Sequence, residues 1–193
     1  KNAFFTAVLY GDRTNKDNFM KSLDSLVKQN LIFMKIVVPV SMKADIEKEG
    51  LLQDNLFFEN SNSKEELFTT ALNNAKTPYI TFCDAEITYA VGSFRLAYRQ
   101  LIKQQYDFIS EGIYHKEYDD SQPLLFSKIA STSLKNGLKY NSSLFMDATL
   151  ANKFFCVNFV KSLHLDFSEE LPELIKLCYM KGNYAYRLDG LLL

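Results

Sequence analysis

The chain has 193 residues, of which 47% are hydrophobic and 23% are charged, a composition that suits one compact domain with a sizeable core. Its formal net charge of −1 leaves no excess of cations to neutralise a nucleic-acid backbone or to hold the chain on an anionic membrane surface, so we expect no nucleic-acid partner. No apolar run approaches the roughly 20 residues that cross a bilayer, so we also expect no membrane span in this segment.

The three cysteines, Cys83, Cys156 and Cys178, are odd in number, far apart and surrounded by apolar or aromatic residues. This pattern favours buried, reduced thiols over a disulfide or a metal site, because a reducing compartment keeps such groups as small hydrophobes. We therefore expect a cytoplasmic protein.

The first part of the chain predicts strands that alternate with helices. Residues 3–10 form a short apolar run that ends at Gly11-Asp12, as expected of a buried first strand. Apolar residues at helical spacing between 19 and 27 predict a helix, with Asn15 or Asp17 as its cap. The nearly continuous apolar run 31–40 predicts a strand that is covered on both faces, which is typical of parallel sheets.

The alternation continues after a third, shorter strand at 56–58. Ser63 and Glu66 have the spacing of a capping box, and Thr77-Pro78 ends the helix that they begin. The elements that follow are a strand at 79–83, a helix from about 92 to 104 and a strand at 107–113. This order predicts a parallel α/β sheet.

The second half, residues 114–193, has a different pattern. A polar segment at 116–122 is followed by a stretch rich in Ser and Asn up to 143, and further helices are predicted after Asp147. No linker rich in Pro or Gly separates the halves, so we expect residues 1–193 to be a single domain whose second half closes over the site. The chain begins without Met and ends on three leucines, from which we expect flanking domains in a longer protein.

Two acidic residues one position apart, Asp84 and Glu86, come directly after the predicted strand 79–83. A strand that carries paired acids to its C-terminal end is how an open α/β sheet places a divalent cation beside a phosphorylated ligand. The spacing therefore points to nucleotide-sugar chemistry, although acids in a solvated strand end have the same spacing.

The segment 75–86, together with the order of elements, resembles the family 2 glycosyltransferases of GT-A fold, whose nucleotide-binding half ends in a similar helix, strand and Asp-x-Asp. Segments 150–155, 163–171 and 179–183 are similar to the acceptor half of bacterial members. The resemblance implies a nucleotide-diphospho-sugar transferase fold, with a mostly parallel central sheet flanked by helices. Residues 1–113 would be its nucleotide-sugar-binding half and 114–193 its acceptor-side half.

The chain also departs from the pattern of that family. Tyr10 is followed by Gly11, where the family usually has a Tyr-Asn pair. The second strand ends in Val38-Pro39-Val40-Ser41, where paired Asp residues usually meet the base and ribose; Val and Pro side chains cannot accept hydrogen bonds from either. Glu86 replaces the final Asp of Asp-x-Asp.

The chemistry implied by the resemblance is transfer of a sugar from a nucleotide-diphosphate donor to an acceptor hydroxyl. It needs a cation, Mg²⁺ or Mn²⁺, to offset charge on the leaving diphosphate, and a carboxylate to take the acceptor proton. The candidates are Asp84 and Glu86 for the metal, Tyr10, Asp12 and Asp84 for the donor, and Glu169, Glu170 and Glu173 for the base. Each has a structural alternative: Gly11-Asp12 is also an ordinary turn dipeptide, and acids in the first turn of a helix complement its dipole.

The function implied is therefore a glycosyltransferase whose acceptor is a saccharide or polymer: a bacterial surface polysaccharide, a teichoic-type polymer or a glycoprotein. The alternative is a catalytically degenerate GT-A-like module that binds a saccharide or a partner domain within a larger polymer-building protein. The missing acids after the second strand favour the alternative, and the acids after the strand at 79–83 oppose it. Any attachment to the inner face of a membrane is expected to come from regions outside this segment.

Overall fold

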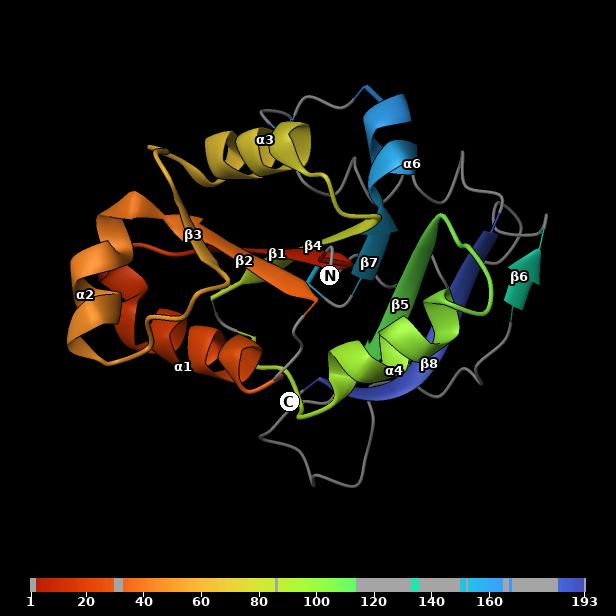
Figure 1. Ribbon diagram of the computed structural model, residues 1–193, viewed down its shortest axis with the longest axis horizontal. Coiled ribbons are helices and arrows are strands. Elements are labelled where there is room, and N and C mark those ends of the chain that lie inside the picture. The colour runs from red at the N-terminus through yellow and green to blue at the C-terminus, as the bar shows by residue number, and fades with distance from the viewer. Residues whose placement is uncertain are drawn as a thin grey trace.

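A central β-sheet organises the computed structural model, which describes residues 3–29, 33–85, 87–113, 133–135, 150–151, 153–164, 167 and 184–192 (Figure 1). Within these residues the sheet has eight strands in the order β3-β2-β1-β4-β7-β5-β8-β6. The strands are β1 (Phe5–Tyr10), β2 (Met34–Pro39), β3 (Leu56–Glu59), β4 (Tyr79–Asp84), β5 (Phe108–Ile113), β6 (Ser133–Lys135), β7 (Lys153–Cys156) and β8 (Tyr184–Leu192).

Helices connect the strands of the first half and cover both faces of the sheet. In the described part of the chain the α-helices are α1 (Lys16–Val27), α2 (Lys43–Lys48), α3 (Lys64–Asn74), α4 (Ser93–Leu101) and α6 (Val157–Ser162). Two short 3₁₀ turns, η1 (Arg13–Asn15) and η2 (Val40–Met42), lead into α1 and α2. Among the described residues, no helix is long and apolar enough to cross a membrane.

The first four strands pair in parallel, as predicted. β1 lies between β2 and β4, and β2 pairs with β3. The pairing of β1 with β4 is unbroken from Phe5↔Tyr79 to Tyr10↔Asp84. All four strands therefore end at the same edge of the sheet, because parallel strands share one direction.

The second half of the sheet is mixed. β7 pairs antiparallel with both β4 and β5, and β6 pairs antiparallel with β8, whereas β5 and β8 are parallel. β7 is antiparallel to both of its neighbours, so β5 runs in the same direction as β4. β8 pairs in parallel with β5 and therefore also runs in the direction of β1–β4. The prediction of a mostly parallel sheet flanked by helices is confirmed, with β7 and β6 as the two reversed strands.

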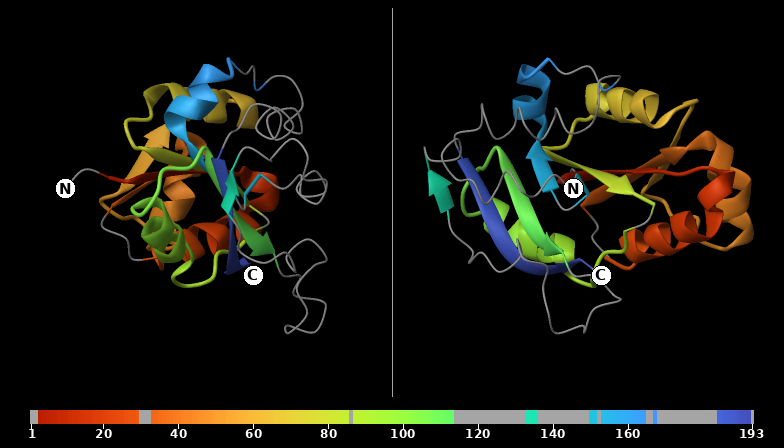
Figure 2. Two further views of the ribbon diagram at one scale, coloured as in Figure 1. Left: turned by 90° about the vertical axis from the view of Figure 1, so that its right-hand side faces the viewer. Right: turned by 180° about the vertical axis from the view of Figure 1, so that it is seen from behind.

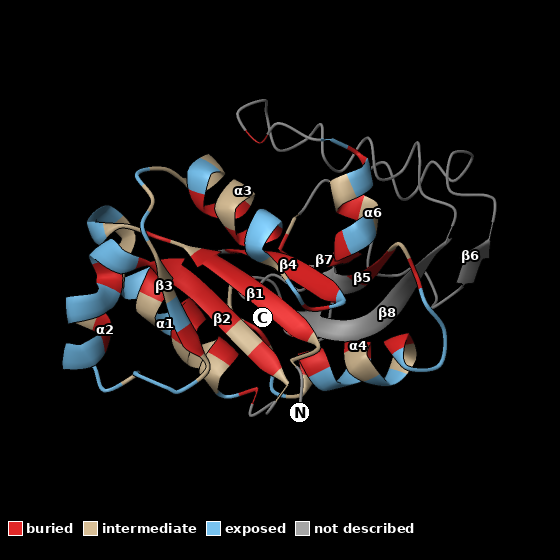
Figure 3. Cartoon of the chain, turned by 45° about the horizontal axis from the view of Figure 1, so that its top comes forward, coloured by how far each residue is buried: buried red, intermediate tan, exposed pale blue. Residues whose placement is uncertain are grey.

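The helices form a layer on each face of the sheet, as Figures 1 and 2 show, with α3 and α6 on one face and α1 and α4 on the other. The α1 face buries Phe5, Leu9, Leu23 and Phe94. Strand residues two positions apart share a face, so the intervening side chains of the same strands pack on the α3 face. The side chains buried there include Val8, Val37, Leu67, Phe68, Phe82 and Phe155. Figure 3 shows the strands β1, β2 and β4 almost wholly buried between these layers.

The predictions and the structure differ in short elements. The segment 153–156 is a strand, whereas only helices were predicted after Asp147, and the helix α2 was not predicted. Of the predicted buried thiols, Cys83 and Cys156 are confirmed as buried cysteines that form no disulfide among the described residues, and Cys178 lies outside these residues. The strand 153–156 has only four residues and no polar alternation, so its sequence carries no period-2 signal.

Two buried threonines differ in whether their hydroxyl groups are hydrogen-bonded, and substitution by Val can test this difference. The buried Thr81 hydroxyl of β4 has no hydrogen-bond partner within the described residues. Val keeps the shape of Thr without the hydroxyl, so we predict that Thr81→Val raises the free energy of unfolding by about 1 kcal/mol in urea denaturation followed by circular dichroism.

The matched control for Thr81 is Thr77, whose buried hydroxyl lies 2.7 Å from that of Thr6 and donates to the Tyr79 carbonyl at 3.0 Å. Thr77→Val removes the hydroxyl that these two groups bond to, and it is expected to lower the free energy of unfolding by about 1–3 kcal/mol. Equal losses for the two variants would show that the Thr81 hydroxyl is satisfied in solution.

Candidate functional site

The candidate site lies at the edge of the sheet where β1, β2, β3 and β4 end. The last register pairs there are Tyr10↔Asp84 and Pro39↔Glu59. In open α/β sheets ligands bind outside the carboxyl ends of the strands. The register therefore brings two of the predicted donor residues, Tyr10 and Asp84, to neighbouring backbone positions at the edge that binds ligands in this architecture.

Tyr10 is the half-buried last residue of β1 and packs against the apolar cluster beneath α3. Burial raises the pKa of its phenol, and the nearby carboxylates of Asp12 and Glu65 raise this pKa further. Glu65 belongs to the first turn of α3. One carboxylate from the loop after β1 and one from α3 thus act on the phenol of Tyr10, and the influence of Glu65 was not predicted from the sequence.

Asp12 is the N-cap residue of η1. Its carboxylate accepts hydrogen bonds from the backbone amide of Thr14 at 2.7 Å and from the Thr14 hydroxyl at 2.5 Å, while Asn15 Oδ1 accepts from the Asp12 amide at 3.0 Å. These hydrogen bonds from Thr14 lower the pKa of the Asp12 carboxyl, so the group is ionised at neutral pH. Both hydrogen bonds from Thr14 reach Oδ1, so Oδ2 of the same carboxylate is the atom that could meet a ligand.

Gly11, between Tyr10 and Asp12, is buried against α1. A Cβ at this position would lie 2.1 Å from Cδ2 of Phe19, which is itself fully buried. The departure from the Tyr-Asn pattern therefore has a steric cause: Phe19 occupies the space that an Asn side chain would need.

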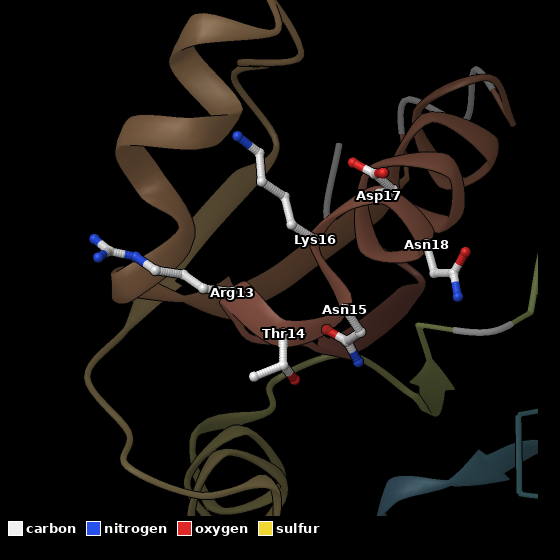
Figure 4. A pocket seen from close by; sticks show the side chains of 6 residues that line it. All are labelled: Arg13, Thr14, Asn15, Lys16, Asp17 and Asn18. Atoms are coloured by element: carbon white, nitrogen blue, oxygen red, sulfur yellow. The ribbon is translucent and has the colours of Figure 1, made fainter.

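An open polar cleft of about 480 Å³ lies along the loop that follows β1 (Figure 4). In this view Arg13 and Lys16 extend to one side of the loop, and Thr14 and Asn15 point to the other. Lys16 reaches α2 and forms an ion pair with Asp45 at 2.6 Å, which lowers the pKa of the Asp45 carboxyl and raises that of the Lys16 ammonium. The cleft presents hydroxyl, amide and guanidinium groups at the strand ends.

The end of β2 carries no acid. Pro39 is buried and Val40 is 43% exposed. The neighbouring β3 ends in the half-buried Glu59, opposite Pro39. In the loop after β3, the hydroxyl of Ser61 is buried without a hydrogen-bond partner in the described part of the chain. Polar groups at this part of the edge therefore come from β3 and its loop.

The structure describes only part of the predicted catalytic set. The backbone of Asp84 ends β4, whereas Glu86, Glu169, Glu170 and Glu173 lie outside the described residues. Among the described residues, no group of three His, Cys, Asp or Glu side chains could hold a metal ion. Mg²⁺ at nucleotide sites usually takes one or two carboxylates and completes its shell with phosphates and water, so Asp84 and Glu86 have suitable donor atoms for such an ion.

Lys153, the first residue of β7, is a polar residue of this region that was not predicted as functional. It is fully buried and pairs with Ser110 of β5. Since β7 runs antiparallel to β4, its first residue lies toward the end of β4, where Asp84 is. The only feature of the sequence that could have identified Lys153 is a single Lys in an otherwise apolar strand.

Solved structures share this arrangement. TarS 1-349 from S. aureus in complex with UDP has a TM-score of 0.79 at 15% identity over 98% of this chain. The complex of TarS 1-349 with UDP-GlcNAc has a TM-score of 0.78 at 17% identity over 98% of this chain. Mannosyltransferase PcManGT from Pyrobaculum calidifontis, in complex with GDP-Man and Mn²⁺, has a TM-score of 0.65 at 13% identity over 100% of this chain. The chain has the GT-A fold.

The GT-A fold is what these likenesses show, because the identities are low. The chain spans 59% of TarS 1-349 in the UDP complex, 57% in the UDP-GlcNAc complex and 56% of PcManGT. No family model matches the sequence, and no curated protein matches it. The expected GT-A fold is thus confirmed by structure alone.

The contact between Gly11 and Phe19 in this GT-A fold is testable. We predict that Gly11→Ala lowers the free energy of unfolding by about 1–3 kcal/mol, because the added methyl overpacks the junction of β1 and α1. Phe19→Ala in the same chain removes the Cγ and Cδ2 atoms that the added methyl meets. It should relieve part of this loss, so that the double variant is less destabilised than the two single changes added together. Simple additivity in this double-mutant cycle, measured by urea denaturation, would contradict the steric explanation.

Proposed function

We propose that the protein is a glycosyltransferase that moves a sugar from a nucleotide-diphosphate donor to an acceptor hydroxyl. The observation that carries the proposal is the register pair Tyr10↔Asp84, at the carboxyl ends of parallel strands in a GT-A fold. The solved structures with this fold hold UDP, UDP-GlcNAc or GDP-Man, which supports a nucleotide sugar as the ligand of the edge.

In this proposal Tyr10 and Asp12 bind the base or ribose of the donor. The half-buried ring of Tyr10 offers an apolar surface, and Oδ2 of Asp12 offers an acceptor for a ribose hydroxyl or a base N–H. The hydrogen bonds from Thr14 fix the carboxylate of Asp12 before a ligand arrives, which lowers the entropy lost on binding.

Asp84 and Glu86 would hold Mg²⁺ or Mn²⁺ through their carboxylate oxygens, which are ligands that hard divalent cations prefer. When bound, such a cation supplies positive charge that offsets the charge developing on the leaving diphosphate. PcManGT was solved with Mn²⁺, which supports a divalent cation in a fold of this type.

The acceptor proton would pass to one of the carboxylates of Glu169, Glu170 and Glu173 in the acceptor-side half. Residues 1–113 would bind the donor, and 114–193 would bind the acceptor within the same domain. For the acceptor we propose a bacterial surface polysaccharide, a teichoic-type polymer or a glycoprotein.

The second candidate function is a GT-A-like module that binds a saccharide or a partner domain without catalysis. The observation that favours it is the end of β2, where buried Pro39 and exposed Val40 replace the acids expected to meet the donor. The two functions differ in one property: only the enzyme needs a nucleotide.

The first experiment is thermal unfolding of the chain with UDP, GDP or CDP, each with Mg²⁺ or Mn²⁺. A nucleotide at 100 times its Kd should stabilise the folded state by about 2.7 kcal/mol and raise the unfolding temperature. Asp84→Ala should remove the metal-dependent part of this shift, because it removes a carboxylate ligand.

The control for Asp84→Ala is Asp54→Ala, which removes an exposed carboxylate from the loop before β3, away from the strand ends. This variant should respond to nucleotide and metal like the unchanged chain. If no nucleotide shifts the unfolding temperature, the binding module becomes the better interpretation. If Asp84→Ala responds like Asp54→Ala, then Asp84 does not hold the cation.

The base is tested by changing Glu169, Glu170 and Glu173 to Gln one at a time. Loss of general-base catalysis should lower the rate of donor hydrolysis or transfer by about 10²–10⁴-fold in one of the three variants, while nucleotide binding is retained. A rate that survives all three changes would place the base elsewhere.

A further inference from the structure

The outer face of α4 and its two ends carry exposed apolar side chains next to exposed cations. Among the described residues, six large hydrophobic side chains are exposed, and three of them lie in this region: Val91 at 81%, Leu96 at 43% and Ile102 at 58%. Isolated exposed apolar residues are normal on protein surfaces. Three within twelve residues form a group that needs an explanation, and we call these three, with Arg95, Arg99 and Lys103, the α4 surface.

Val91 is held outward by a turn. The amide of Ser93 donates to the carbonyl of Ala90 at 3.1 Å, and Gly92 has φ +90° and ψ −1°, which are the features of a type II turn. Val91 occupies the second position of this turn, where its side chain projects into solvent. The left-handed conformation of Gly92 is one that a residue with a side chain rarely adopts, so the turn is a fixed feature of the backbone.

The cations of the α4 surface lie along the same face of the helix. Arg95 and Arg99 are exposed and four positions apart, so they lie on one side of α4. Lys103 follows at the same spacing in the turn after the helix, where its amide donates to the carbonyl of Gln100. None of the three forms an ion pair within the described residues.

The segment that contains the α4 surface has no compensating acid. Residues 87–106 include three cations and no Asp or Glu, although the whole chain has a net charge of −1. The opposite face of α4 is apolar, with Phe94, Ala97 and Leu101 buried in the core. The helix is thus fixed to the sheet by its apolar face and presents cations beside exposed apolar side chains on the other face. Cations that attract anionic lipids and apolar side chains that enter the headgroup region are the two contributions that hold a helix at a membrane surface.

We propose that the α4 surface binds the anionic surface of a lipid bilayer, with Arg95, Arg99 and Lys103 at the headgroups and Val91, Leu96 and Ile102 dipping into the interface. The overall charge does not reveal this site, because acids elsewhere in the chain balance its cations. This inference goes beyond the proposed function and is independent of it.

Charge complementarity identifies an anionic partner, and the exposed apolar side chains favour a bilayer over a soluble polyanion. A polyanion such as a phosphate-rich polymer contacts cations but offers no apolar phase for Val91 and Ile102. The Phe94 amide of α4 donates to Gln29 Oε1 at 3.4 Å, and Gln29 Nε2 donates to the Ala90 carbonyl at 2.9 Å. Gln29 follows the C-terminal end of α1, and the ring of Phe94 packs against Phe5 at the start of β1, so the start of the α4 surface lies at the edge of the sheet opposite the candidate site.

The test is sedimentation of the 193-residue chain with vesicles of phosphatidylcholine alone and of phosphatidylcholine mixed with phosphatidylglycerol. We expect binding to the anionic vesicles only, weakening as salt is raised. The variant Arg95→Gln/Arg99→Gln/Lys103→Gln should bind about a hundredfold more weakly, because each cation near an anionic membrane contributes about fivefold. Val91→Ser/Ile102→Ser should weaken binding at least about tenfold without a change of charge.

The matched control is Lys21→Gln/Lys48→Gln/Lys76→Gln, which removes three exposed cations from α1, α2 and the loop before β4 and changes the net charge equally. It should bind the anionic vesicles nearly as well as the unchanged chain. Equal losses in the two triple variants, or no binding to anionic vesicles, would overturn the proposal.

A second arm replaces the vesicles by soluble polyphosphate. If polyphosphate binds as strongly as the vesicles and Val91→Ser/Ile102→Ser binds it unchanged, the surface is a site for a soluble polyanion and the membrane proposal is wrong. Nucleotide-dependent thermal shifts, measured on the same variants, report the proposed function separately and should be the same in all of them.

Discussion

The parallel pairing of β1 with β4 is the constraint on which the candidate site depends. Six consecutive register pairs, from Phe5↔Tyr79 to Tyr10↔Asp84, fix where both strands end. A slip of one residue would turn the buried side chains of β4, such as Ile80 and Phe82, from the α3 face toward the α1 face. Since both faces of this sheet are packed, the register is strongly specified by the core, and the positions of Tyr10 and Asp84 follow from it.

The fold was predictable where apolar runs are long and helix signals are local. The run 31–40 and the capping box at Ser63 gave β2 and α3, and in the structure Ser63 Oγ accepts from the amide of Glu66 at 3.1 Å. β7 was not predicted, because a four-residue run has no measurable period and its pairing with β4 and β5 is set by distant residues. α2 has only six residues and buries one side chain, Ile46, so it lacks an apolar stripe.

The candidate site was predictable in its location but less so in its details. Acids after a strand point to a sheet edge, and the register places Asp84 beside Tyr10 there. The capping hydrogen bonds of Asp12 depend on the conformation of η1, and the proximity of Glu65 to Tyr10 depends on how α3 packs on the sheet. Contacts of this kind depend on how separate elements pack in three dimensions, so they could not be predicted from the sequence.

In the proposed function, the polar groups that recognise the donor would lie on the β1 side of the sheet edge. β2 ends in Pro39 and Val40, which offer no side-chain acceptor to a base or a ribose. Two described carboxylates, those of Asp12 and Glu65, raise the pKa of the Tyr10 phenol. If the protein binds a nucleotide sugar as we propose, these two groups are placed to accept the hydrogen bonds that acids after β2 would otherwise receive. The missing acids then mark a change in where the donor is recognised, and they do not by themselves require the loss of donor binding.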